Sequence, residues 1–370
     1  MKKLLLFALI FVQMVSAQEL ALVRKDGRFG YVNKSGEFVI QPKFKTAKSF
    51  SDGLAAVEDN KKWGFINPKG EWVIPATFDD AKYFDSGICV VAKDKRWFYI
   101  NKKGETLQGP TTDKIYDFED GIAFIKIGDK IGFMDSKFKI ILEPKYQLIK
   151  SFENGFARVK NNDRWGIIDQ YGKVVVEVIY DEVGNFYKGT TWAKNGDTFG
   201  LVTNGKFLAL DGVDKIYDFY KQDLTYARKK DRVGFIDLKG NWVIEPKFDK
   251  ARAFVNNLAP VAVGKKWGYI NTKGTFVIEP AFDDAEVFSP DGLAPVREKD
   301  WGFINESGKV VIPTQYGITA GGLFSIFKDE DKGFVKGIAR VKNDKKWGFI
   351  NKEGQVLGNQ WFENAELFNK

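Results

Sequence analysis

The chain has 370 residues, with 57 basic and 49 acidic side chains, a formal net charge of +8, one cysteine and no histidine. The lack of histidine removes the commonest general base, the commonest transition-metal ligand and the side chain that titrates near neutral pH. A single cysteine excludes an intramolecular disulfide, so the hydrophobic core must stabilise the fold.

The first seventeen residues have the pattern of an export signal. Two lysines precede an apolar run over 4–12, and small side chains follow at 15–17. We expect residues 1–17 to be a signal peptide, cleaved before Gln18, and the mature chain to lie in the periplasm, at the outer-membrane surface or outside the cell. No later stretch is apolar for about 18 residues, so no transmembrane helix is expected.

A 34-residue repeat fills the mature chain. Its marker is the glycine of a Trp-Gly pair. The first nine marker positions are spaced 34 residues apart. The last interval is 46 residues, which indicates an insertion within about 317–332. The marker positions are Gly30, Gly64, Phe98, Gly132, Gly166, Gly200, Gly234, Gly268, Gly302 and Gly348. We therefore expect residues 18–370 to form one domain of ten units.

Each unit has short β-branched and aromatic runs between polar turns. In the second unit these runs are 54–57, 63–67, 71–75 and 81–84. Such runs predict strands, and no window shows helical periodicity. The expected fold is all-β, with four short antiparallel strands in each unit.

Two recurring positions predict the geometry inside a unit. An Asn or Asp such as Asn67 bonds its side chain to the following backbone, and a glycine such as Gly70 supplies a positive φ, so together they form a hairpin turn. The marker glycine leaves room for an indole or for a neighbouring strand. We expect ring stacking between successive units.

These motifs resemble the WG-repeat family of bacterial proteins. The resemblance is clearest at 63–67 (Trp-Gly-Phe-Ile-Asn), 267–271, 301–305 and 347–351, and it covers essentially all of the mature chain. Departures include Trp97-Phe98 and Ile131-Gly132, and the sixth copy, near 203–210, is the most degenerate. The resemblance implies a β-rich repeat and brings no catalytic residues with it.

Units of this size must stack to bury their faces, either in a closed ring or along an open superhelix. The mature chain begins with a second-strand sequence, 20–23, and ends with a first-strand sequence, 365–368. A ring sealed by pairing its two ends requires this offset. We therefore expect a propeller-like closed ring, with an open β-solenoid or superhelix as the alternative.

Basic residues recur in the turn before the Trp-Gly strand, and equivalent turns lie on one edge of a stacked array. They predict a positive rim that attracts anionic glycans, or alternatively lysines that keep exposed turns soluble. The residues of this basic rim are Lys61, Lys62, Lys95, Arg96, Lys229, Lys230, Arg232, Lys265, Lys266, Lys345 and Lys346.

Aromatic residues that recur at one phase of the repeat, such as Phe44, Phe78, Phe248 and Phe282, are expected in the core. Aromatic residues outside this register are the candidates for ligand binding. They are Trp192, Tyr217, Tyr220, Tyr226 and Trp361, together with Phe324 and Phe327 in the insertion.

Adjacent carboxylates recur at Asp79-Asp80 and Asp283-Asp284. Their equivalent phases favour turn caps over a catalytic or calcium site. No phosphate-binding loop, nucleophile elbow or cysteine-pair metal motif is present.

The sequence therefore predicts no catalytic residue, no metal, no cofactor and no nucleic-acid partner. We expect a non-catalytic binding scaffold of the cell envelope or the extracellular space, whose ligand is a protein or a glycan. The alternative is a lectin or a polysaccharide lyase-like enzyme that acts on anionic glycans. The sequence leaves the oligomeric state open.

Overall fold

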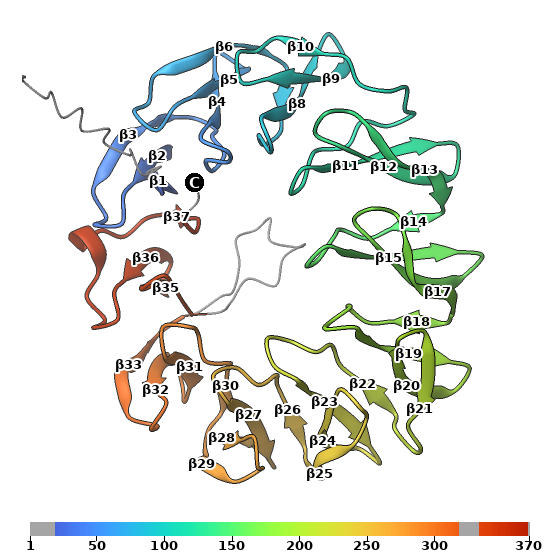
Figure 1. The fold of residues 1–370 in the computed structure, drawn as a ribbon. Coiled ribbons are helices and arrows are strands. Elements are labelled where there is room, and N and C mark those ends of the chain that lie inside the picture. Colours follow the sequence, from blue (N-terminus) through green and yellow to red (C-terminus); the bar gives the residue numbers. More distant parts are fainter. Residues whose placement is uncertain (1–18, 318–332, 369–370) are drawn as a thin grey trace, which may run out of the picture.

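The computed structural model describes residues 19–317 and 333–368, which form ten small antiparallel sheets arranged in a ring (Figure 1). The chain is thus a ten-bladed β-propeller, which confirms the all-β repeat. Seven sheets have the expected four strands, whereas the second, fourth and tenth have three. In the described part, helix is limited to the 3-10 turn η1 (Leu357–Asn359).

The strands of each sheet are hydrogen-bonded in the order given below, and Figure 1 shows this order running from the central opening to the perimeter in the sheet of β11, β12 and β13. The first five sheets comprise β37 (Asn364–Ala365), β1 (Ala21–Lys25), β2 (Arg28–Val32) and β3 (Phe38–Phe44); β4 (Ala55–Asp59), β5 (Lys62–Ile66) and β6 (Trp72–Phe78); β7 (Asp80–Ala81), β8 (Ile88–Lys93), β9 (Arg96–Asn101) and β10 (Thr106–Leu107); β11 (Ile122–Ile127), β12 (Lys130–Asp135) and β13 (Ile140–Tyr146); and β14 (Leu148–Ile149), β15 (Phe156–Asn161), β16 (Arg164–Asp169) and β17 (Val174–Tyr180). The last five comprise β18 (Glu182–Val183), β19 (Thr190–Asn195), β20 (Thr198–Thr203) and β21 (Lys206–Ala209); β22 (Lys215–Ile216), β23 (Leu224–Lys229), β24 (Arg232–Asp237) and β25 (Trp242–Phe248); β26 (Lys250–Ala251), β27 (Leu258–Val263), β28 (Lys266–Asn271) and β29 (Phe276–Phe282); β30 (Asp284–Ala285), β31 (Leu293–Arg297), β32 (Trp301–Asn305) and β33 (Val310–Tyr316); and β34 (Phe334–Val335), β35 (Ile338–Asn343) and β36 (Lys346–Ile350).

The ring is closed by the two ends of the described chain. In the first sheet β1 pairs with β37, and Val23 lies opposite Ala365. The backbone N–H of Glu366 also donates to the carbonyl of Leu22 over 2.8 Å. This pairing confirms the closed ring and makes the open superhelix wrong, because an open array has no strand bond between its first and last units.

Successive blades are held together by aromatic pairs whose rings meet edge-on or tilted. The residue after the marker glycine contacts a phenylalanine on the inner loop of the next blade, as in Phe65 and Phe84, whose ring centres are 4.8 Å apart. Both rings are about 1% exposed, and each buried ring of this size contributes roughly 2 kcal/mol. The same contact recurs at Tyr31–Phe50, Tyr99–Phe118, Phe133–Phe152, Phe235–Phe254, Tyr269–Phe288 and Phe303–Phe334. Ring contact between units is therefore made by this residue rather than by the tryptophan.

The marker glycine makes room for the outer strand of its own blade. A Cβ on Gly64 would lie 2.6 Å from the carbonyl oxygen of Ile74 in β6, closer than any side chain tolerates. At Gly348 an indole does fill the space, because a Cβ there would lie 2.8 Å from the ring of Trp361. Both expected uses of the bare backbone thus occur, and the neighbouring strand is the usual one.

The predicted hairpin turn is confirmed. The Oδ1 atom of Asn67 accepts hydrogen bonds from the backbone N–H groups of Lys69 and Glu71, and Gly70 has a φ of 81°. The same pair of side-chain bonds is made by Asn33, Asn101, Asp135, Asp169, Asp237, Asn271, Asn305 and Asn351. The expected signal peptide, 1–17, lies outside the described residues, as do 318–332 of the expected insertion.

Candidate functional site

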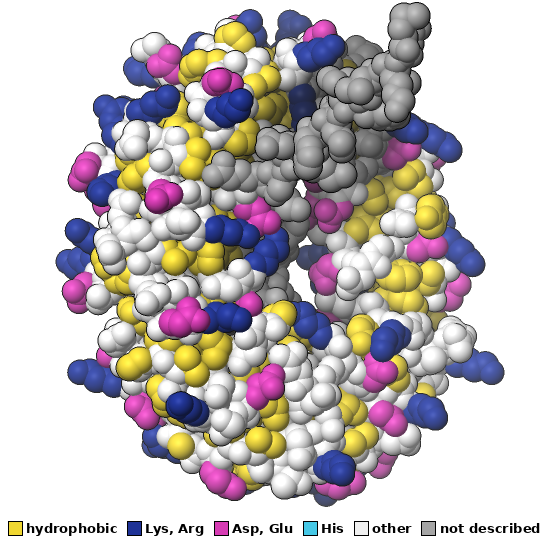
Figure 2. All heavy atoms as spheres, turned by 60° about the vertical axis from the view of Figure 1, so that its left-hand side comes forward, with side chains coloured by type: hydrophobic (Ala, Val, Ile, Leu, Met, Phe, Trp, Pro, Cys, Tyr) yellow, Lys and Arg dark blue, Asp and Glu magenta, His cyan; other side chains and the backbone are white. Residues whose placement is uncertain are grey.

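The basic rim residues lie in and beside the turns between the second and third strands, as expected, but several are ion-paired. Lys62 pairs with Asp79 and Lys266 with Asp283, and the second distance is 2.7 Å. Arg164 with Asp181 and Arg232 with Asp249 repeat the arrangement. On the face shown in Figure 2, basic side chains are interspersed with acidic ones and form no continuous band.

Three of these carboxylates also accept a backbone hydrogen bond from a hairpin turn. Asp79 accepts the backbone N–H of Asp94 in the next blade over 2.7 Å, and the Lys62 hydrogen bond holds the pKa of Asp79 below its usual range. Asp181 and Asp249 cap the next turn in the same way. Of the carboxylates considered as catalytic candidates, Asp79 therefore caps a turn, and Asp283 is ion-paired with Lys266.

Two of the aromatic candidates occupy a regular position of the repeat. Trp192 and Tyr226 lie 34 residues apart, in the middle of β19 and β23, where β8 carries Val90. The indole Nε1 of Trp192 donates to Asp218 over 2.7 Å. The interpretation of these two residues as lying outside the register was wrong, since neighbouring units vary in residue type at one shared position.

The remaining aromatic candidates are spread over the ring. The ring of Tyr217 stacks on that of Tyr226, with centres 4.1 Å apart, and Tyr220 follows in the same inner loop. Trp361 packs into the core cluster between the ninth and tenth blades. Phe324 and Phe327 lie outside the described residues. The structure thus pairs Tyr217 with Tyr226, bonds Trp192 to Asp218 beside Tyr217, and places Trp361 in a different core cluster.

A cavity lies where the third unit departs from the repeat. Phe98 replaces the marker glycine, and a side chain at this position collides with a regular outer strand, as the Cβ distances at the other glycines show. The third blade accordingly has a two-residue outer strand, β10, which ends at Leu107 opposite Tyr99. The chain then takes a different path to the fourth blade.

Thr112 is the second departure of the third unit from the repeat. It stands where other units have an aromatic residue such as Phe78 or Tyr146. Its hydroxyl group accepts the backbone N–H of Lys126 over 2.9 Å and donates to the carbonyl of Lys114 over 2.8 Å. The fourth sheet begins at β11, without the two-residue inner strand found in its neighbours. A missing aromatic ring and a missing strand leave open space.

Phe138 fills another part of this gap. In other units a turn glycine stands at its position and packs on an outer-strand isoleucine of the preceding blade, as Gly104 does on Ile74. The third blade lacks that isoleucine, and the Phe138 ring packs instead against Tyr99 and Phe118, with centres 5.2 and 5.8 Å away. Phe138 has a φ of 60°, so the ring is kept there despite backbone strain.

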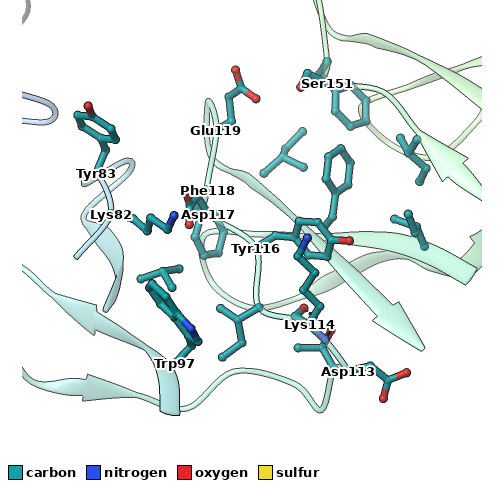
Figure 3. Close-up of a pocket in the computed structure, with 18 of the residues that line it drawn as sticks. Lys82, Tyr83, Trp97, Asp113, Lys114, Tyr116, Asp117, Phe118, Glu119 and Ser151 are labelled. Carbon is teal, nitrogen blue, oxygen red and sulfur yellow. Dashed lines mark hydrogen bonds between the residues drawn. The ribbon is translucent and has the colours of Figure 1, made fainter. Parts of the chain in front are cut away.

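The resulting cavity has a volume of about 1200 Å³ and spans the third to fifth blades. Figure 3 shows Lys82, Tyr83 and Trp97 on one side and Lys114 and Tyr116 on the other. Rings and charged groups alternate on its wall: the Lys82 amine lies 5.4 Å from the centre of the Trp97 ring and the Lys114 amine 4.6 Å from that of Tyr116.

Asp117 is an acidic group between these walls, and Asp113 and Glu119 also line the cavity. Its carboxylate lies near the Lys82 amine (Figure 3). Desolvation by the surrounding protein raises the pKa of Asp117, and the charges of Lys82 and Lys48 oppose this shift. Desolvation, helped by the charge of Glu366, raises the pKa of Tyr83 to about 12. The cavity wall thus carries three carboxyl groups, from Asp113, Asp117 and Glu119, the two amines of Lys82 and Lys114, and the phenols of Tyr83 and Tyr116.

Sequence reasoning named Trp97-Phe98 as a departure from the motif but assigned no site to it. The sequence feature that could have indicated this site is that one unit departs from the repeat twice. Phe98 replaces the marker glycine, and Thr112 replaces an aromatic residue. The free thiol Cys89 is buried nearby, and burial raises its pKa.

Within residues 19–317 and 333–368, no three Cys, Asp or Glu side chains are grouped closely enough to hold a metal ion. A search of the same ranges finds no helix with the length and apolar character needed to cross a membrane.

Comparison with known proteins identifies the repeat. The model described as WG containing repeat matches residues 29–63, 63–97, 97–130, 131–165, 165–199, 234–267, 267–300 and 301–317. No curated protein matches the chain.

Solved structures give only distant likenesses. A eukaryotic initiation factor is 13% identical over 79% of this chain and 95% of its own, with a TM-score of 0.43. Hsv2p from Kluyveromyces lactis is 8% identical, over 61% and 92% of the two chains, with a TM-score of 0.28. A calcium-binding protein, regucalcin, from Agrobacterium tumefaciens is 13% identical, over 52% and 82%, with a TM-score of 0.25. These scores carry no information about function.

Proposed function

This chain belongs to the WG containing repeat family, and from that premise we propose that it is an exported, non-catalytic binding scaffold whose ligand is a protein or a glycan. The observation that carries the proposal is the cavity of about 1200 Å³ at the third unit. Binding sites are concave, largely apolar surfaces with a few polar groups, and this cavity has that composition.

The ionisable groups around the cavity support binding rather than catalysis. The chain has no histidine, and burial raises the pKa of Tyr83, which lines the cavity, to about 12. A raised pKa disfavours the tyrosinate form that a lyase base requires. The raised pKa of the buried Cys89 thiol likewise makes it a poor nucleophile.

The test is affinity capture from cell-envelope extract with chain 18–370 as bait, at low and high salt. Trp97→Ala is the cavity variant, and Trp72→Ala is its matched control, because the two indoles are similarly exposed, at 41% and 44%, and Trp72 lies on the perimeter strand β6. We expect a prey that resists high salt and is lost with Trp97→Ala alone. A turnover activity that survives purification and is abolished by one point substitution would overturn the proposal.

Lectin activity is the second candidate function. The exposed rings of the cavity make the cavity a better glycan site than the basic side of the ring, where acidic partners neutralise several of the basic side chains. A glycan ligand released by high salt would instead assign binding to the rim.

A further inference from the structure

We propose that the cavity between the third and fifth blades binds a neutral oligosaccharide, with sugar rings stacked on Tyr83 and Trp97 and hydroxyl groups bonded to Lys82, Lys114 and Asp117. This inference rests on the proposed binding function and specifies its ligand and its residues.

The aromatic side chains supply flat apolar surfaces inside a concave site. Tyr83 is 40% exposed and Trp97 is 41% exposed, whereas the equivalent tryptophan of the eighth unit, Trp267, is 8% exposed. Burying an exposed ring on an apolar face gains hydrophobic free energy. A pyranose has such a face, formed by its C–H groups.

The polar groups distinguish a sugar from other ligands. A purely apolar ligand would leave Lys82, Lys114 and Asp117 desolvated and unbonded, at a cost of several kcal/mol. Sugar hydroxyl groups both donate to a carboxylate and accept from an amine, so one ligand satisfies all three.

The charge balance favours a neutral sugar. The Lys82 and Lys114 amines already lie over the rings of Trp97 and Tyr116, and their charge opposes a cationic ligand. The Asp117 carboxylate lies between the two walls and opposes a polyanion, and Asp113 and Glu119, which also line the cavity, add to that repulsion.

The size of the cavity favours several sugar units. Sites for small molecules measure roughly 300–1,000 Å³, and this one reaches about 1200 Å³. Its walls come from consecutive units, so it is a short trough across blades rather than a hole within one blade.

The repeat itself supplies a way to close the cavity without removing any of the proposed contact residues. Thr112→Phe restores the aromatic residue that Phe78 and Tyr146 provide in other units, and Thr112 lines the cavity. The added ring occupies ligand space and leaves Tyr83, Trp97 and Asp117 in place.

The experiment is isothermal titration of chain 18–370 with neutral hexasaccharides of glucose, mannose, xylose and N-acetylglucosamine, with hexagalacturonate as the acidic comparator. We expect at least one neutral sugar to bind with a dissociation constant on the order of 0.1 mM. Trp97→Ala and Asp117→Asn each weaken it about tenfold or more, Thr112→Phe abolishes it, and Trp72→Ala leaves it unchanged. Thermal unfolding of each variant shows whether it is folded.

Three results overturn the inference. The first is that no neutral hexasaccharide binds at millimolar concentration, and the second is that hexagalacturonate binds more tightly than every neutral sugar. The third is that folded Trp97→Ala and folded Thr112→Phe bind the neutral sugar as tightly as the natural chain does. A protein prey in the envelope capture that is retained by Thr112→Phe would leave the scaffold proposal standing and remove the sugar site. An absence of any ligand in both experiments would remove both.

Discussion

Val23 in β1 is the register partner of Ala365 in β37, so one sheet contains residues from both ends of the described chain. Both side chains are fully buried, and the carbonyl of Ala365 accepts a hydrogen bond from Arg340 over 2.8 Å. The seam between the first and last blades is therefore a packed core rather than a loose contact.

We predict that Ala365→Asp opens the ring. A carboxylate at this fully buried position has to be desolvated or protonated, which costs about 3 kcal/mol. The expected results are a lower free energy of unfolding and a larger radius of gyration in solution scattering. Glu353→Ala, on an exposed turn, is the control and should change neither. An unchanged radius together with an unchanged stability would show that the seam does not hold the ring closed.

A second prediction concerns the marker glycine. A Cβ on Gly302 would lie 2.5 Å from the backbone oxygen of Ile312. A backbone atom in a paired strand cannot relieve this clash by rotating, as a side chain can. We expect Gly302→Ala to lower the free energy of unfolding by about 2–4 kcal/mol.

The comparison is Gly264→Ala, a turn position with a φ of 62° and no atom near the added methyl group, where backbone strain alone costs about 1 kcal/mol. Equal losses in urea unfolding would show that close approach of β33 to Gly302 is not what selects glycine there.

The architecture was predictable because it depends on features that recur. Asn67 and Gly70 show their role through their counterparts in other units, and the strand phases of the two ends predicted the seam of Val23 and Ala365. A period also predicts that rings such as Phe78 and Phe248 are buried, since equivalent positions of regular units have similar environments.

The candidate site was not predictable by the same route. Periodicity indicates that Phe98 and Thr112 are exceptions, but it does not indicate what fills the space they leave. Trp192 was predicted to bind ligand because its residue type is unusual at its position, but its indole donates a hydrogen bond to Asp218. The cavity depends on the three-dimensional path from β10 to β11, where the short inner strand found in the two neighbouring blades is absent.

A third prediction tests how the gap beside β10 is filled. Phe138 has a φ of 60° and packs on Tyr99 and Phe118. Phe138→Ala removes the ring and keeps the strain, so we expect a loss of about 2 kcal/mol. Phe138→Gly removes the strain as well and should lose about 1 kcal/mol less. Chemical unfolding gives both values. A glycine variant more stable than the natural chain would mean that the ring contributes less than the strain costs.

The last prediction concerns acid. Glu19 accepts hydrogen bonds from Lys336 in the tenth blade and pairs with Lys34 in the first, over 2.8 and 2.9 Å. These bonds, with that of Lys336 the larger cause, lower the pKa of Glu19 from 4.5 to about 2.

Because the folded pKa lies below the unfolded one, the stabilisation is complete above about pH 4.5 and is lost as the pH falls towards 2. Both lysines are well exposed, at 44% and 61%, so screening by solvent limits the contribution to about 1 kcal/mol. We expect Glu19→Gln to lower the melting temperature at pH 7 and to match the natural chain near pH 2. A difference between the two that persists unchanged at pH 2 would mean that the ion pairs of Glu19 are not its source.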